Sequence, residues 1–150
     1  MSIKIAQTII EALESEAEKK GVTPEELLLD LLLGVVPEED KPKAVLETVE
    51  DILSKADKYA SDGNYKEAFK RLWSCTSLAF RAYALKTGKP KPEKLEDYWG
   101  LAAELGGAAF YALYSGIAAE AAAAKGLSDG GHYKAMRSAI EKLIEQVKAS

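Results

Sequence analysis

Residues 64–87 read NYKEAFKRLWSCTSLAFRAYALKT, and this segment is expected to form the central helix of the fold. Asn64 followed by Glu67 is the capping-box pattern that begins a helix. Apolar side chains then recur at helical spacing in two stripes. The first stripe is Ala68, Leu72, Cys75, Ala79 and Ala82, and the second is Phe69, Trp73, Thr76, Phe80 and Tyr83. A helix that is apolar on two sides must be covered on both, so we expect Trp73 to lie near the centre of the core.

The segments on either side of this helix carry the same helical periodicity. Further helices are predicted over residues 6–20, 24–33, 44–61, 93–105, 108–125 and 132–148, with turns at Gly21, 34–42, 62–63, 88–92, 106–107 and Ser128–Gly131. The one candidate strand is Ser2–Ile5. The sequence therefore predicts an all-α protein, an up-and-down helical bundle preceded by an N-terminal helical hairpin. Residues 37–42, PEEDKP, read as a linker that separates the hairpin (1–36) from the bundle (37–150).

The second helix of the hairpin is unusually rich in leucine, reading LLLDLLL over residues 27–33. Leucines on more than one face need more cover than a short hairpin supplies. Large apolar patches on soluble proteins usually mark interfaces. We therefore expect a homodimer, and the candidate interface residues are Leu27, Leu28, Leu31 and Leu32.

Several common enzyme classes lack their signatures in this chain. The phosphate-binding glycine loops and the HExxH, CxxC and GxSxG motifs are all absent. With one cysteine (Cys75) and one histidine (His132), we expect no disulfide, no metal site, no cofactor and no catalytic set. Cys75 falls in a core stripe, where a buried and inert thiol is the expectation.

The polar candidates for ligand contact are Arg71, Arg81, His132 and Arg137. An arginine on an apolar helix is costly to bury unless it is paired. For Arg71 and Arg81 the partner is either a glutamate of a neighbouring helix or a phosphate, and the sequence favours the glutamate. His132 reads as a solvated histidine at the start of the last helix, with a general base or a nucleotide contact as the alternative.

Charge and hydropathy limit the partners of the protein. The net charge is −4, and residues 1–36 hold seven acidic against three basic residues, which disfavours nucleic acid as a partner. The longest uncharged apolar run, residues 105–119, is shorter than a membrane span, and the acidic start does not resemble a signal peptide. We therefore expect a cytoplasmic protein with no membrane partner. One Asn and two Gln beside 17 Glu and 17 Lys indicate a thermophilic source.

Two further patterns in the sequence resemble known families. Residues 57–80, DKYASDGNYKEAFKRLWSCTSLAF, resemble one tetratricopeptide hairpin, but no second copy follows and the arrays of this repeat need at least three. The chain is identified as a member of the archaeal PaREP family by Ala56-x-x-Tyr59, by Gly63-Asn64-Tyr65-x-x-Ala68, by Leu72-Trp73, and by GVTPEELLL in the hairpin. That family resembles the HEPN helical bundles. The resemblance implies a dimer that works as a ribonuclease or as the partner of a small nucleotidyltransferase.

The sequence departs from the ribonuclease members of the HEPN bundles, and this departure argues against catalysis. The ribonuclease members carry an arginine followed by a histidine on one helix, whereas here His132 precedes Arg137. The prediction is a non-catalytic helical bundle that binds a partner protein or a nucleotide, as a homodimer. One alternative is a HEPN-type ribonuclease or nucleotidyltransferase partner that uses His132 with Arg81 or Arg137 across an interface. A second is a DNA-binding, antitoxin-like protein acting through residues 1–36, which resemble the helices of ribbon-helix-helix proteins.

Overall fold

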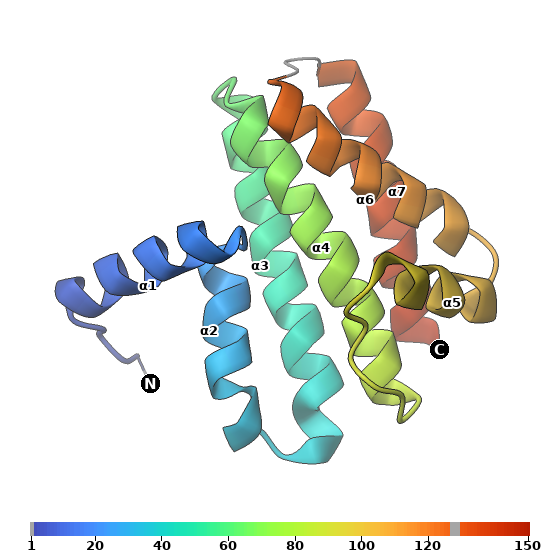
Figure 1. Cartoon of the computed structure of the whole chain (residues 1–150), viewed down its shortest axis with the longest axis horizontal. Helices are drawn as coiled ribbons and strands as arrows, with labels where there is room; N and C mark the ends of the chain where they lie inside the picture. Colours follow the sequence, from blue (N-terminus) through green and yellow to red (C-terminus); the bar gives the residue numbers. More distant parts are fainter. Residues whose placement is uncertain (1, 127–129) are drawn as a thin grey trace.

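The computed structural model describes residues 2–126 and 130–150, and every regular element within these ranges is a helix. The fold is thus an all-α helical bundle, as predicted. The α-helices are α1 (Gln7–Lys20), α2 (Pro24–Leu32), α3 (Lys41–Ser61), α4 (Tyr65–Lys86), α5 (Leu95–Leu105), α6 (Ala109–Lys125) and α7 (Gly130–Ala149) (Figure 1). Short 3₁₀ turns, η1 (Leu33–Val35) and η2 (Glu38–Asp40), connect α2 to α3.

Local capping groups set the ends of several helices. The Thr23 hydroxyl accepts a hydrogen bond from the Glu26 amide (3.2 Å) and begins α2, and the Asn64 side chain accepts one from the Glu67 amide (3.4 Å) before α4. Gly21 ends α1 with a φ of 68°, in the left-handed region that favours glycine. The sequence predicted these three ends correctly.

Two connections differ from the sequence prediction. The linker expected at 37–42 is largely helical, because Glu38–Asp40 form a 3₁₀ turn and α3 already begins at Lys41, with Pro42 in its first turn. Residues 2–6, which include the candidate strand Ser2–Ile5, have no regular structure. The predicted turn Ser128–Gly131 lies partly outside the described residues, and its last two residues begin α7.

Helix α4 is the centre of the bundle, as its two apolar stripes indicated. It packs beside α3 on one side and against α6 and α7 on the other, while α5 lies across one end (Figure 1). Phe69, Leu72 and Phe80 are fully buried. The expectation for Trp73 is wrong in one respect: the indole is only half-buried and lies at the border of the core.

Two contacts fix the helices around α4. Gly116 of α6 lies so close to Thr76 of α4 that a Cβ at position 116 would be 2.5 Å from the Thr76 hydroxyl oxygen. On the other side, Asp57 of α3 accepts hydrogen bonds from the Tyr133 hydroxyl (2.7 Å) and from Arg137 Nε and Nη2 (2.8 and 2.9 Å) of α7. The first contact sets the spacing of α4 and α6, and the second ties α7 to α3.

The two helices of the N-terminal hairpin differ in how far the bundle covers them. Leu29 and Leu33 join the main core as α2 packs along α3. Helix α1 packs mainly on α2 and projects away from the other helices (Figure 1). Its predicted apolar stripe is covered only near the turn: Ala17 is buried, Leu13 and Ile10 are half-buried, and Ile9 is 60% exposed.

Candidate functional site

The first candidate surface is an apolar stripe on α2 and η1, which we call the hairpin face. It consists of Leu28, Leu31, Leu32 and Val35, which follow one another at helical spacing. Leu28 is half-buried, whereas Leu31, Leu32 and Val35 are 65%, 50% and 81% exposed. Ile3, Ile5 and Ile9 in and before α1 are exposed as well. The chain therefore leaves large aliphatic side chains of its hairpin uncovered.

One of the four predicted interface residues does not belong to this surface. Leu27 is buried, together with Ala17, apart from the main core. Leu27 lies in the first turn of α2, and α1 packs on α2. Leu27 is therefore a packing residue of the hairpin, and the interface candidates that remain are Leu28, Leu31 and Leu32.

The second candidate is a cavity of about 600 Å³ where the hairpin meets the bundle, which we call the cleft. Its residues come from α2, α4, α5, the 87–94 segment and Glu120 of α6. On its α2 side, Glu26 Oε1 accepts hydrogen bonds from the hydroxyls of Ser74 (3.4 Å) and Ser77 (3.3 Å). The buried Thr23 hydroxyl lies 3.2 Å from that of Ser74. The hydroxyl groups of Ser74 and Ser77 on α4, which we call the hydroxyl row, thus hold the side chain of Glu26.

Aromatic and charged groups complete the cleft. The rings of Trp73 and Tyr98 have their centroids 5.8 Å apart. Arg81 forms an ion pair with Asp30, and Lys91 lies 3.8 Å from the same carboxylate. Burial raises the pKa of Glu26, the Asp30 charge raises it further, and the Ser77 and Ser74 hydroxyls oppose the shift. Burial also raises the pKa of Tyr98 to about 12.

Each arginine that the sequence put forward as a ligand candidate already has a carboxylate partner. Arg71 is buried on α4, pairs with Glu67 of the same helix (2.7 Å) and lies over the Tyr59 ring (4.4 Å to its centroid). Arg81 pairs with Asp30 of α2. The prediction of a glutamate on a neighbouring helix is therefore correct for Arg81 in the helix but not in the residue type, and for Arg71 the glutamate belongs to its own helix.

The remaining two candidates lie on α7. Arg137 is held by Asp57 and by Glu141 (2.7 Å), and the Asp57 hydrogen bond raises the pKa of the guanidinium. His132 lies in the first turn of α7 with an exposed side chain. The three arginines engage carboxylates at three separate places, and the structure does not gather them into one site.

Arg71 also lines a further cavity, of about 530 Å³, between α1 and the α3–α4 pair. Within the part of the chain that the structure describes, the Nε of Arg71 has no hydrogen-bond partner. The charged groups of this cavity balance, however, since its lining holds the three cations Lys55, Lys58 and Arg71 and the three carboxylates of Glu14, Glu25 and Asp62. The cavity therefore offers no net charge of either sign to a ligand.

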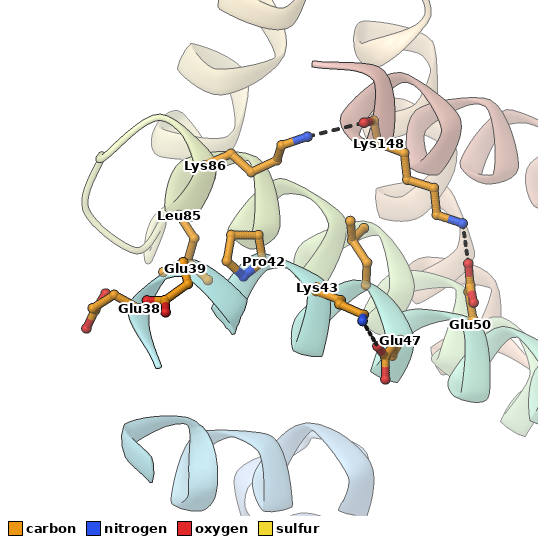
Figure 2. A pocket seen from close by; sticks show the side chains of 10 residues that line it. Glu38, Glu39, Pro42, Lys43, Glu47, Glu50, Leu85, Lys86 and Lys148 are labelled. Carbon is orange, nitrogen blue, oxygen red and sulfur yellow. Dashed lines mark hydrogen bonds and ion pairs between the residues drawn. The ribbon is translucent and has the colours of Figure 1, made fainter. Parts of the chain in front are cut away.

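A groove of about 610 Å³ lies at the end of the bundle where α3 begins and where α4 and α7 end. Figure 2 shows the ion pairs along its rim, Lys43 with Glu47 and Lys148 with Glu50. Lys86 donates hydrogen bonds to the carbonyl oxygens of Val147 (2.8 Å) and Lys148 (3.2 Å). A lysine near the last carbonyls of a helix stabilises its negative end. Lys86 thus fastens the end of α7, and the other two lysines of the groove, Lys43 and Lys148, are already paired.

The thiol of Cys75 is buried, and it donates a hydrogen bond to the Val49 carbonyl (3.5 Å). Burial raises its pKa far above the usual range, which keeps the thiol protonated.

Among the described residues no group of His, Cys, Asp and Glu could hold a metal ion. None of the helices in this part of the chain combines the length and the apolar character that a membrane span requires.

Comparisons with protein-family models, with curated proteins and with solved structures gave no match to this chain. The hairpin face and the cleft are therefore defined by their geometry. The hydroxyl row and the Trp73–Tyr98 pair are parts of the cleft that sequence analysis missed. Ser74 and Ser77 lie on the side of α4 away from both apolar stripes, where they share a face with Lys70 and Arg81, and these small hydroxyl residues were the one available signal.

Proposed function

We propose that this chain is a non-catalytic helical bundle that works as a protein-interaction module and forms a homodimer through its hairpin face. The observation that carries this proposal is the exposure of Leu31, Leu32 and Val35 on one side of α2 and η1. Their transfer out of water is favourable by about 25 cal/mol per Å² of apolar surface. The bundle itself covers the other side of α2 and leaves this one open.

The chemistry of the face favours a second copy of the chain as the occupant. The stripe Leu28, Leu31, Leu32 and Val35 carries no charge, so it has no complement in a strongly acidic or basic partner. A two-fold contact uses the same patch on both subunits, and an uncharged leucine stripe is complementary to itself.

The arginine pairs and the family resemblance bear on the other parts of the proposal. The carboxylate partners of Arg71, Arg81 and Arg137 favour a protein over a nucleotide as the bound partner, and they give no support to a ribonuclease site. The all-α bundle is compatible with the resemblance to the PaREP and HEPN families. With that resemblance we propose a cytoplasmic protein of a thermophilic archaeon, for which a small nucleotidyltransferase is a candidate partner.

Light scattering on the purified chain tests the proposal. We expect a particle of twice the 16.2 kDa chain mass at micromolar concentration. The double variant Leu31→Glu/Leu32→Glu places two charges on the hairpin face, and we expect it to be a folded monomer, because both side chains are already exposed. Circular dichroism before the measurement verifies that the variant is helical.

A matched control carries the same two charges on another exposed surface. Tyr111 and Tyr114 of α6 are 64% and 68% exposed, and Tyr111→Glu/Tyr114→Glu should leave the dimer intact. Loss of the dimer in this control alone would place the contact on α6. A wild-type chain that stays monomeric, or that forms a complex only with a nucleotidyltransferase, would also contradict self-association.

A further inference from the structure

The cleft differs in its charges from the cavity that Arg71 lines and from the groove at the end of the bundle. Its lining holds four carboxylates, Glu26, Asp30, Glu93 and Glu120, against the two cations Arg81 and Lys91. Asp30 is paired with Arg81 and lies 3.8 Å from Lys91, and the other three carboxylates leave the lining with more negative than positive charge. A phosphate or carboxylate ligand would meet no uncompensated cation here, whereas a positive ligand would meet an excess of negative charge.

Glu26 is the carboxylate best placed to receive such a ligand. The serine hydroxyls of α4 fix its Oε1, and within residues 2–126 and 130–150 no hydrogen bond reaches its Oε2. Removal from water makes the negative charge of Glu26 costly, and its raised pKa agrees with this cost. A cation beside it would offset that cost, because two opposite charges attract more strongly where water is partly excluded.

The apolar part of the cleft is also suited to an organic cation rather than a metal ion. The neighbouring rings of Trp73 and Tyr98, with centroids 5.8 Å apart, line the cleft and offer apolar surface. The side chain of Leu78 adds aliphatic lining. A volume of about 600 Å³ lies within the range of small-molecule sites. A metal ion would instead need three or more ligating side chains together, which the described residues lack.

We propose that the cleft binds a small primary alkylammonium ligand, with its ammonium group on Glu26 and its alkyl chain against Trp73 and Tyr98. The N–H groups of a primary ammonium can donate both to Glu26 and to the Ser77 hydroxyl beside it. The proposal does not depend on dimerisation, because every residue in the argument belongs to one chain.

Binding can be measured by NMR with n-butylammonium chloride as the probe. We expect a saturable shift of the Trp73 indole resonance at about millimolar concentration, the affinity expected of so small a ligand. The Trp73→Phe variant identifies that resonance among the two indoles. The neutral n-butanol, of nearly the same shape, and adenosine monophosphate should produce no saturable shift, with ionic strength held constant.

Two charge-neutralising variants separate the Glu26 carboxylate from the general field of the protein. Glu26→Gln keeps the size of the side chain, and we expect it to lower the affinity for n-butylammonium by about tenfold or more. Glu26→Gln should also fold at least as well as the wild type, because it removes a negative charge that burial makes unfavourable. Glu47→Gln makes the same change at the groove of Figure 2 and should leave binding unchanged.

Three results would overturn the proposal. The first is the absence of a saturable shift with n-butylammonium up to about tenfold above the millimolar range expected for it. The second is equal binding in folded Glu26→Gln and in the wild type. The third is a preference for adenosine monophosphate, which would identify the cleft as an anion site formed by Arg81 and Lys91.

Discussion

Gly116 lies at a close approach of α6 to Thr76 of α4. A Cβ there would lie 2.5 Å from Thr76 Oγ1 and 2.7 Å from Thr76 Cγ2, distances that real Cβ atoms do not adopt. Thr76 cannot turn away freely, because it is fully buried and its hydroxyl donates to the Leu72 carbonyl (2.8 Å). The two helices must therefore move apart if any side chain is added at position 116.

We predict that Gly116→Ala lowers the free energy of unfolding by about 1–3 kcal/mol, the usual cost of overpacking a core. In a chain of this length that corresponds to a fall of roughly 2–4 °C in the melting temperature for each kcal/mol. Thermal unfolding followed by circular dichroism measures the effect.

The control for this prediction is Gly100→Ala in α5. Gly100 is also helical, but a Cβ there would meet nothing within 4 Å. Alanine favours the helix over glycine by up to about 1 kcal/mol, so the control should be neutral or stabilising. Equal destabilisation by both substitutions would show that the α4–α6 spacing is not the cause.

Individual residues also mark the limit of what the sequence could predict. Cys75 and Phe80 are buried as their places in the two stripes indicated. Trp73 shares a stripe with Phe80 but is half-buried, because the helices over that part of α4 leave the cleft open. Helical spacing tells which side of a helix is apolar, and it does not tell how completely a neighbour covers each position.

At the scale of the elements, the seam between α3 and α7 depends on one carboxylate. Asp57 accepts three hydrogen bonds, and one comes from the buried Tyr133 hydroxyl. We predict that Asp57→Ala lowers the free energy of unfolding by about 1–3 kcal/mol, chiefly because the Tyr133 hydroxyl loses its acceptor inside the protein. Chemical denaturation measures this loss.

Glu141→Ala is the matched control, because Glu141 binds the same Arg137 from the exposed side of α7. Exposed ion pairs contribute about 0–1 kcal/mol, so this variant should unfold almost as the wild type does. If Glu141→Ala proves as destabilising as Asp57→Ala, the stability of the seam comes from the arginine and not from the buried tyrosine.

The ends of the elements were predictable where a local group sets them. Thr23, Asn64 and Gly21 act within a few residues of the helix ends they mark, so their effect can be read from neighbouring letters. The cleft could not be foreseen in this way, since Glu26 and Ser77 are 51 residues apart in the chain. The direction of α1 was equally hidden, because its apolar stripe does not specify which helix covers it.

At the scale of the whole molecule, charge decides how the protein meets nucleic acid. The net charge is −4, and each of the three arginines is bound to a carboxylate. We predict neither binding nor cleavage of RNA at physiological salt, because phosphate contacts require cations that are free to replace counterions. Gel-shift and cleavage assays with mixed RNA substrates provide the measurement.

The contrary result would be RNA cleavage by the wild-type chain that disappears in His132→Ala. Cleavage that persists in that variant would indicate a contaminating nuclease. The first result would establish the HEPN-type ribonuclease alternative and assign a catalytic part to the exposed histidine of α7.

The open hairpin face has a consequence for the life of the protein in a cell. Exposed leucine stripes are the kind of surface that chaperones hold and proteases recognise in incompletely folded chains. If two copies close the face, the fraction of chains that display it rises whenever synthesis falls, by mass action. A reduced gene dose would then lower synthesis and also raise the fraction of chains that are degraded. The abundance of the protein would therefore fall more steeply than in proportion to its expression.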